Sequence, residues 1–209
     1  MISPSCSRFF PEVPVKRLLL ATLAVCAFAF ASTAAQSKPG DKGWITLFDG
    51  KNLNNFNIVG DANWNLANGI VEANKGVGYL VSKETYGNFE LKVEFWVDSG
   101  TANSGVYLRC QDGTKITDTT CYEANIFDQR GDQSGRTGSI VHVSKPSINI
   151  DAAGKWNTYE ISARGPRLIV KLNGTETVNA EGTKFTRGPL ALQYMAGTVR
   201  FRNVQIRPL

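Results

Sequence analysis

A carboxylate and a guanidinium are placed where two neighbouring strands could bring them together. Glu123 and Asn125 share one side of an alternating segment, and Tyr107 and Arg109 share one side of the alternating segment before it. A short connection between the segments makes them candidate neighbours, so Arg109 and Glu123 could meet. Such a pair is either a surface ion pair worth about 0–1 kcal/mol or a catalytic pair in which the carboxylate moves a proton and the guanidinium stabilises charge.

Other polar and aromatic residues are candidates for ligand contacts. Trp96 and Tyr107 occupy the polar sides of their segments, where flat rings could stack on a ligand ring or cover a sheet edge. Asn103 could bind a hydroxyl or form an Asx turn. Arg136, in a glycine-rich segment, could close over a ligand or remain solvated. His142 is the only histidine, and is either the acid–base group near neutral pH or a surface strand residue.

Short alternating segments must position these residues. Apolar residues recur at every second position of segment 90–97, namely Leu91, Val93, Phe95 and Val97. Asn173-Gly174 predicts a hairpin, and Asn203 breaks the alternation of the last segment, which indicates a bulge. About a dozen such segments between turn residues predict an all-β sandwich or barrel.

Composition restricts the class of protein. The chain has 209 residues, of which 42% are hydrophobic, enough for one domain with one core. The formal net charge is +5, but basic residues are mixed with acidic ones and form no basic run, which argues against a nucleic-acid partner. The sequence contains no phosphate-binding glycine loop, no GxSxG elbow and no histidine pair for zinc. It makes no prediction of oligomeric state.

The N-terminus predicts export. In residues 1–35, Lys16-Arg17 precedes the apolar stretch 18–31, and small residues follow. These 14 apolar residues are too few for a membrane span, which needs about 20. We therefore expect a cleaved signal peptide, no stable membrane span in the mature chain, and a periplasmic or extracellular location. Residues 36–43 are predicted to be a flexible lead-in to a single domain at 44–209.

Cysteine usage agrees with export. Only Cys110 and Cys121 lie beyond the predicted signal, and an even pair in an exported protein predicts a disulfide. The chain-entropy model gives such a short loop about 3 kcal/mol of stabilisation. A metal site is the alternative, but two thiols with one distant histidine fit it poorly.

Ordered sequence segments resemble a known family. The segments are GWITLFDGKNLNNF, NFELKVEFWV, ANSGVYLR, CYEANIFD, TGSIV, GKWNTYEI, VKLNG, GPLALQY and VRFRNVQIRPL. Together they resemble the 3-keto-disaccharide hydrolase domain family over roughly residues 43–209. The resemblance implies a jelly-roll sandwich of two antiparallel sheets, of the concanavalin A-like lectin/glucanase type. It also implies hydrolysis or elimination at a glycosidic bond of a sugar that carries a 3-keto group.

The implied chemistry needs a base, an enolate-stabilising group and an acid. A 3-keto group acidifies the proton at C2, whose removal lets the aglycone leave C1, and water adds afterwards. Glu123, in CYEANIFD, matches the family's tyrosine-glutamate strand and is the preferred base or acid. Arg109 follows the motif Asn103-Ser104-Gly105 and could hold a sugar oxygen or the enolate. No cofactor is required, but calcium remains an option because sandwich lectins often carry it.

The sequence departs from the family at two candidate positions. Relatives often have a basic residue at the position of Trp96 and a small residue at that of His142. The resemblance therefore does not support a catalytic role for His142, which rests on its chemistry alone. A lectin-like carbohydrate-binding module and a structural envelope protein are the alternative functions, since one fold serves several.

Overall fold

The computed structural model describes residues 43–209, so the predicted signal peptide and nearly all of the lead-in lie outside the described residues. The domain contains thirteen strands and one short 3-10 turn, η1 (Gln133–Gly135). The strands are β1 (Ile45–Phe48), β2 (Phe56–Gly60), β3 (Asn65–Ala67), β4 (Ile70–Ala73), β5 (Gly78–Tyr86), β6 (Phe89–Val97), β7 (Ser104–Leu108), β8 (Tyr122–Ile126), β9 (Trp156–Arg164), β10 (Arg167–Leu172), β11 (Thr175–Glu181), β12 (Gly188–Tyr194) and β13 (Val199–Pro208). No helix in the described residues is long and apolar enough to cross a membrane.

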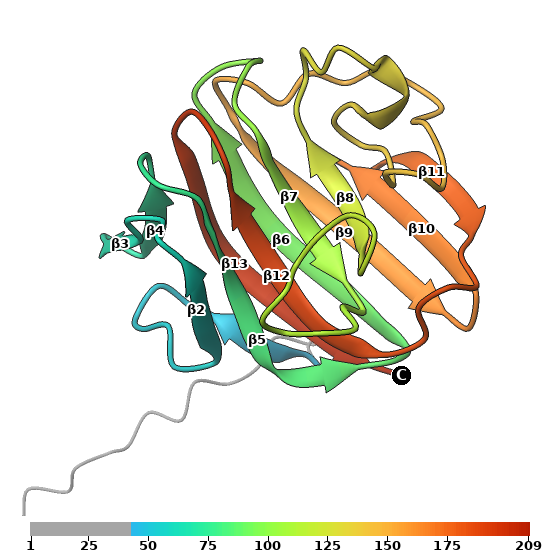
Figure 1. Cartoon of the computed structure of the whole chain (residues 1–209), viewed down its shortest axis with the longest axis horizontal. Helices are drawn as coiled ribbons and strands as arrows, with labels where there is room; N and C mark the ends of the chain where they lie inside the picture. The colour runs from blue at the N-terminus through green and yellow to red at the C-terminus, as the bar shows by residue number, and fades with distance from the viewer. Residues whose placement is uncertain (1–42) are drawn as a thin grey trace, which may run out of the picture. The chain divides into compact units, whose positions relative to one another are not determined.

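The strands form two antiparallel sheets packed face to face, which confirms the predicted sandwich (Figure 1). The eight-stranded sheet has the order β11-β10-β9-β6-β13-β4-β3, and β1 also pairs with β13. The five-stranded sheet has the order β2-β5-β12-β7-β8. Neighbouring strands in both sheets are often distant in sequence, so residues from β7, β8 and β12 lie together on one surface.

Alternation in β6 builds the core as predicted. Leu91, Val93, Phe95 and Val97 are all buried in the main hydrophobic cluster between the sheets. Burial of each such side chain stabilises the fold by roughly 1.5–3 kcal/mol relative to exposure. The intervening residues of β6 face outward from the eight-stranded sheet.

Local backbone signals also act as the sequence predicts. Asn173 and Gly174 have φ angles of 53° and 82° and close the two-residue turn between Leu172 and Thr175. Asn203 has a φ of 49° and lies inside the register shift where β13 pairs with β6, which confirms the bulge.

The predicted disulfide is present and ties down the loop between β7 and β8. Cys110 and Cys121 are bonded and buried. They pack with Ile116 of the same loop against outward-facing residues of the five-stranded sheet, including Tyr107 and Ala191. Loop 109–121 therefore covers part of the outer face of this sheet and forms a second, smaller hydrophobic cluster there.

Candidate functional site

A cavity of about 460 Å³ lies beside loop 109–121 on the outer face of the five-stranded sheet. Three adjacent strands contribute Tyr107 (β7), Glu123 (β8) and Gln193 (β12). The other lining residues are Tyr79, Asn103, Ile116, Thr117, Asp118, Phe127, Arg130 and Met195. We call this space the Glu123 cavity.

Glu123 is fixed in the cavity by its strand neighbours. It lies directly opposite Tyr107 in the antiparallel pair of β7 and β8. A Cβ atom at Gly105 would lie 2.7 Å from Oε1 of Glu123, closer than side chains tolerate. Glycine at position 105 therefore makes the space in which the carboxyl group rests.

Burial gives Glu123 an unusual acidity. Its side chain is removed from water, with the residue only 5% exposed, and this desolvation raises its pKa from 4.5 to about 7. The Tyr107 hydroxyl opposes the rise, the negative charge of Asp118 adds to it, and the positive charge of Arg130 reduces it. Near neutral pH the group is present both as carboxylate and as carboxylic acid, which suits acid–base chemistry.

A hydrogen-bond network supports the cavity floor. Nε2 of Gln193 donates to the hydroxyl of Tyr107 at 3.0 Å and to that of Tyr79 at 3.3 Å. Burial and the nearby Glu123 charge raise the pKa of Tyr107 far above its usual value, so its hydroxyl keeps its proton. Within residues 43–209, Oε1 of Gln193 is buried and has no hydrogen-bond partner. An acceptor left in this way favours a ligand that brings a donor.

Arg109 does not meet Glu123, so the predicted pair is wrong. No ion pair between these residues exists in the described domain, and Arg109 has a φ of 51°, which breaks the strand alternation. Its buried guanidinium donates to the carbonyl oxygens of Gly87, Gly165 and Phe185. Nη2 also lies 3.4 Å from Oδ1 of Asn88. Arg109 ties β7 to three loops and does not line the cavity.

Trp96 and Tyr107 do not form the predicted stacking platform, because they belong to different sheets. Trp96 lies on β6 in the eight-stranded sheet, and the guanidinium of Arg200 covers its ring at 4.2 Å. Tyr107 lies on β7 in the five-stranded sheet and lines the Glu123 cavity. Strand alternation identified outward-facing rings but could not tell which sheet each ring belongs to.

Of the remaining residues predicted to contact a ligand, one lines the Glu123 cavity and two hold a loop in place. Asn103 lines the Glu123 cavity. Asn125 is buried on β8, where its side chain donates to the Gly135 carbonyl and accepts from the backbone of Ile126. Arg136 is also buried and pairs with Asp151. Asn125 and Arg136 thus fasten the loop after β8 and do not line this cavity.

His142 does not line the Glu123 cavity but contacts a residue that does. Its Nε2 is 3.0 Å from Oδ2 of Asp118, whose side chain lines the Glu123 cavity. His142 itself lines a neighbouring space of about 560 Å³, which we call the His142 cavity and which Asp118 also borders. Asp118 therefore borders both cavities, and the backbone N–H of Val141, next to His142, donates to the carbonyl oxygen of Glu123.

Several cavity residues were not identified from the sequence. Gln193 is the one polar side chain in the otherwise apolar segment GPLALQY. Tyr79 precedes the buried Leu80 in β5 and so lies on the opposite side of that strand. Strand patterns therefore contained a weak indication that both side chains face away from the core. Asp118 and Arg130 lie on loops, where no periodicity predicts the direction of a side chain.

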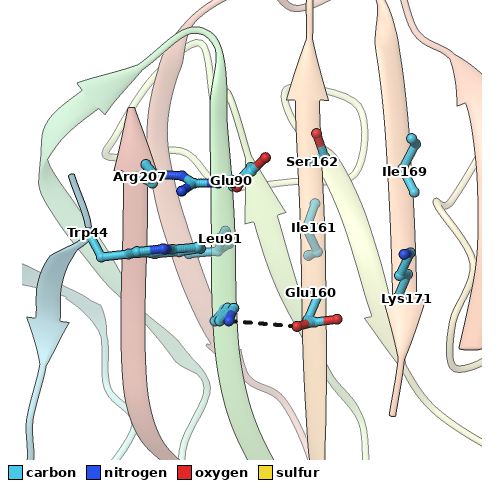
Figure 2. A pocket seen from close by; sticks show the side chains of 10 residues that line it. Trp44, Glu90, Leu91, Glu160, Ile161, Ser162, Ile169, Lys171 and Arg207 are labelled. Atoms are coloured by element: carbon cyan, nitrogen blue, oxygen red, sulfur yellow. Dashed lines mark hydrogen bonds and ion pairs between the residues drawn. The ribbon is translucent and has the colours of Figure 1, made fainter. Parts of the chain in front are cut away.

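A groove of about 420 Å³ on the eight-stranded sheet is a poorer candidate. Figure 2 shows Trp44 beside Arg207 at one side of the groove, and the dashed line marks the 3.8 Å ion pair of Glu160 with Lys92. Two cations, Lys92 and Arg207, lie 5.1 and 5.2 Å from the centre of the Trp44 ring and compete with a sugar for it.

Glu90, one of the two carboxylates of this groove, is more acidic than usual. Desolvation acts to raise the pKa of Glu90, but hydrogen bonds from Arg164 and Arg207 outweigh it and hold the pKa below the usual value. Glu90 is therefore ionised and paired, whereas Glu123 is poised to exchange a proton.

Metal-binding side chains do not cluster in the described domain. Within residues 43–209, no group of three or more histidine, cysteine, aspartate or glutamate residues could hold an ion.

The sequence of the domain matches a known family. Residues 43–207 match the model of the 3-keto-alpha-glucoside-1,2-lyase-like domain, and the chain belongs to this family. It is a glycosyl hydrolase-like member of a fold that also serves carbohydrate-binding modules. No curated protein matches the sequence.

Solved structures agree with this assignment. A candidate glycosyl hydrolase from Parabacteroides distasonis ATCC 8503 is 29% identical, with a TM-score of 0.68, over 79% of this chain and 99% of that chain. A second one from the same organism is 20% identical, with a TM-score of 0.71, over 80% and 94% of the two chains. The carbohydrate-binding module CBM66 from Bacillus subtilis is 17% identical, with a TM-score of 0.57 over 79% and 95%, and shows the shared fold.

Proposed function

We propose that this protein cleaves the glycosidic bond of 3-keto-glycosides outside the cytoplasm, with Glu123 as the acid–base group. One observation carries the proposal: a buried carboxyl group with a pKa of about 7 lines a cavity of about 460 Å³ in a member of a carbohydrate-active family. Cavities of this size are typical of small-molecule sites.

The reaction begins when Glu123 removes the proton from C2 of the sugar. The C2–H electron pair becomes an enolate with the 3-keto group, and Glu123 holds the proton. Arg130, which lines the same cavity, supplies positive charge for the enolate oxygen. When the enolate collapses, a C1–C2 double bond forms and the bond from C1 to the leaving oxygen breaks. The Glu123 proton passes to that oxygen.

Hydration completes hydrolysis. Water adds its oxygen to C1 and a proton returns to C2, so elimination followed by hydration consumes one water molecule in total. The elimination step alone is a lyase reaction, and both outcomes use the same acid–base group. A neighbouring carboxylate at glycosidase spacing is not needed, because no oxocarbenium ion forms.

Polar groups around Glu123 suit a hydroxylated ring. A sugar hydroxyl could donate to the unpartnered Oε1 of Gln193, which would otherwise remain unsatisfied at a cost of about 1–3 kcal/mol. The half-buried Asn103 is positioned to contact a further hydroxyl. The Tyr107 hydroxyl accepts a hydrogen bond from Gln193 and keeps its own proton, which it can donate to the Glu123 carboxylate.

The disulfide supports a location outside the cytoplasm. Cys110 and Cys121 are bonded in the loop that forms one wall of the Glu123 cavity, and such bonds persist in oxidising compartments. Together with the export signal predicted in residues 1–35, this favours a periplasmic or extracellular protein.

The proposal is tested with purified mature protein and matched sugars. We expect cleavage of 3-keto-trehalose or 3-keto-lactose and no cleavage of the unoxidised disaccharides. Chromatography of the products measures cleavage, in reactions with and without a chelator. Glu123→Gln keeps the shape and removes the basicity, so turnover should fall at least about 100-fold. Glu94→Gln makes the same chemical change on the opposite sheet and should leave turnover unchanged.

Three outcomes would contradict the proposal. Near-wild-type turnover in Glu123→Gln would reject Glu123 as the base. Equal cleavage of oxidised and unoxidised sugars would remove the 3-keto requirement. Binding of plain sugars without turnover of any 3-keto sugar would indicate a carbohydrate-binding module instead.

A further inference from the structure

Two cavities adjoin at a single side chain. The Glu123 cavity and the His142 cavity both border Asp118, and the hydrogen bond between Nε2 of His142 and the Asp118 carboxylate lies at their boundary. Their volumes, about 460 and 560 Å³, are similar, and each is within the range of small-molecule sites. A ligand with two linked units could therefore place one unit on either side of this boundary.

The His142 cavity has the surface character of a sugar subsite. Lys184 and Glu181 line it and provide a charged donor and a charged acceptor. Tyr122 and Phe185 also line it, but both residues are only 3% exposed and pack in the main core, so the ligand contacts offered here are polar. Exposed polar groups around such a space match the hydroxyl groups of a sugar unit.

His142 presents an unoccupied polar atom to this cavity. Its side chain is 61% exposed, and within residues 43–209 only Nε2 of the ring makes a hydrogen bond. Its φ of 62° is left-handed. Among the described non-glycine residues only Arg109 and three asparagines share such a φ, and buried hydrogen bonds account for Arg109. Backbone hydrogen bonds from Val143 and Ser144 to the Ile140 carbonyl close the turn that holds His142 in this conformation and leave its side chain exposed.

We propose that the His142 cavity binds the part of the substrate beyond the scissile bond, a second sugar unit, with His142 as a specificity residue. The inference rests on the proposed function, because the unit that carries the 3-keto group must occupy the Glu123 cavity, next to the base. The leaving unit then crosses the Asp118–His142 boundary and contacts the polar atoms of His142 and Lys184.

The test compares two substrates that differ only beyond the scissile bond. We expect the wild-type protein to cleave both 3-keto-trehalose and methyl 3-keto-glucoside, with a lower KM for the disaccharide. His142→Gly removes the ring and suits the left-handed backbone. It should raise the KM of the disaccharide about five- to tenfold, the equivalent of one hydrogen bond, and change kcat and KM of the methyl glycoside less than about twofold.

Two further variants make the test decisive. Lys184→Ala should also raise the KM of the disaccharide and leave that of the methyl glycoside unchanged. If His142→Gly lowers the melting temperature, Lys184→Ala serves as the test in its place. Lys171→Ala is the matched control, because Lys171 lines the groove on the opposite sheet, and it should change neither substrate.

Distinct results separate the two proposals. Unchanged kinetics in both variants, or equal losses on both substrates, would overturn the leaving-unit subsite while the proposed function stood. An equal KM of the wild type for the two glycosides would do the same. A wild type that cleaves neither glycoside would overturn the subsite, and failure to cleave 3-keto-lactose as well would refute the proposed function.

Discussion

The outer faces of the two sheets contain the same kinds of residue but differ in their chemistry. On the eight-stranded sheet, arginines of β13 pair with glutamates and cover tryptophan rings, as in Arg202, which lies 2.6 Å from Glu94 and 4.0 Å from the centre of Trp156. On the five-stranded sheet, loop 109–121 covers part of the face and buries Glu123 and Tyr107. Burial, and not the residue type, raises the pKa of Glu123 above that of the glutamates on the other sheet face.

The arginines show the same contrast. Arg109 is 1% exposed and holds backbone carbonyls from three loops, whereas the side chain of Arg202 is 37% exposed and forms an ion pair in contact with water. Burial makes each hydrogen bond harder to replace, since water cannot take over when the side chain is removed.

Replacement of Arg109 should give the largest loss of stability. Arg109→Met retains much of the apolar stem but leaves the carbonyls of Gly87, Gly165 and Phe185 without their donor. We expect the free energy of unfolding in urea to fall by at least about 3 kcal/mol. A loss below about 1 kcal/mol would show that the buried arginine is no more important than an exposed one.

Glu123 should make stability depend on pH. Its pKa is about 7 in the folded protein against 4.5 in the unfolded chain, so the folded state is favoured fully below pH 4.5 and loses this contribution as pH rises through 7. The loss is about 3 kcal/mol at most. Glu123→Gln should remove this part of the pH dependence, as measured by urea unfolding at several pH values.

The matched change on the opposite sheet provides the contrast. Glu94→Gln removes a half-buried, paired carboxylate and should leave the wild-type pH dependence between pH 5 and 8 intact. If Glu123→Gln and the wild type lost stability equally over that range, Glu123 would not be a raised-pKa group.

The space made by Gly105 should matter for turnover. Gly105→Ala would place a Cβ 2.7 Å from Oε1 of Glu123 and displace the carboxyl group, so we expect kcat to fall about tenfold. Gly113→Ala is the control, because a Cβ there meets Pro189 and Val81 at ordinary distances of 3.6 and 3.7 Å. Equal kcat in both variants would show that the position of Glu123 is not critical.

The smallest effect is expected on the open face. Arg202→Ala removes one exposed ion pair and one cation–π contact, which together should be worth about 1 kcal/mol. Thermal unfolding measures it, and turnover should not change. A loss as large as that of Arg109→Met would remove the distinction between the two faces.

Much of the fold was predictable from the sequence because its signals are local. Alternation in β6, the Asn173-Gly174 turn and the bulge at Asn203 each depend on a few neighbouring residues, and all three are confirmed. The Cys110–Cys121 bond followed from compartment and cysteine count, and it is also confirmed.

The site was predictable only in part, because it depends on how distant segments pair. Tyr107 and Glu123 were correctly predicted to lie on neighbouring strands, and Asn103, a candidate hydroxyl contact, also lines the cavity. The positive φ at Arg109 reversed its side chain, and the sheet to which Trp96 belongs is a property of strand order. Loop residues such as Asp118 and Arg130 reach the cavity through folding of the whole domain.

The fate of the hydrogen at C2 tests the central claim, acid–base cleavage by Glu123, most directly. A 3-keto-glycoside with deuterium at C2 is cleaved by the wild-type protein in ordinary water, and the product is examined by mass spectrometry. The same substrate incubated with the Glu123→Gln variant, and recovered uncleaved, measures the spontaneous exchange of the C2 deuterium with water. The account predicts that the wild-type product has lost its deuterium while the substrate held with the variant retains it. Cleavage with the deuterium kept at C2 would contradict removal of that proton by Glu123.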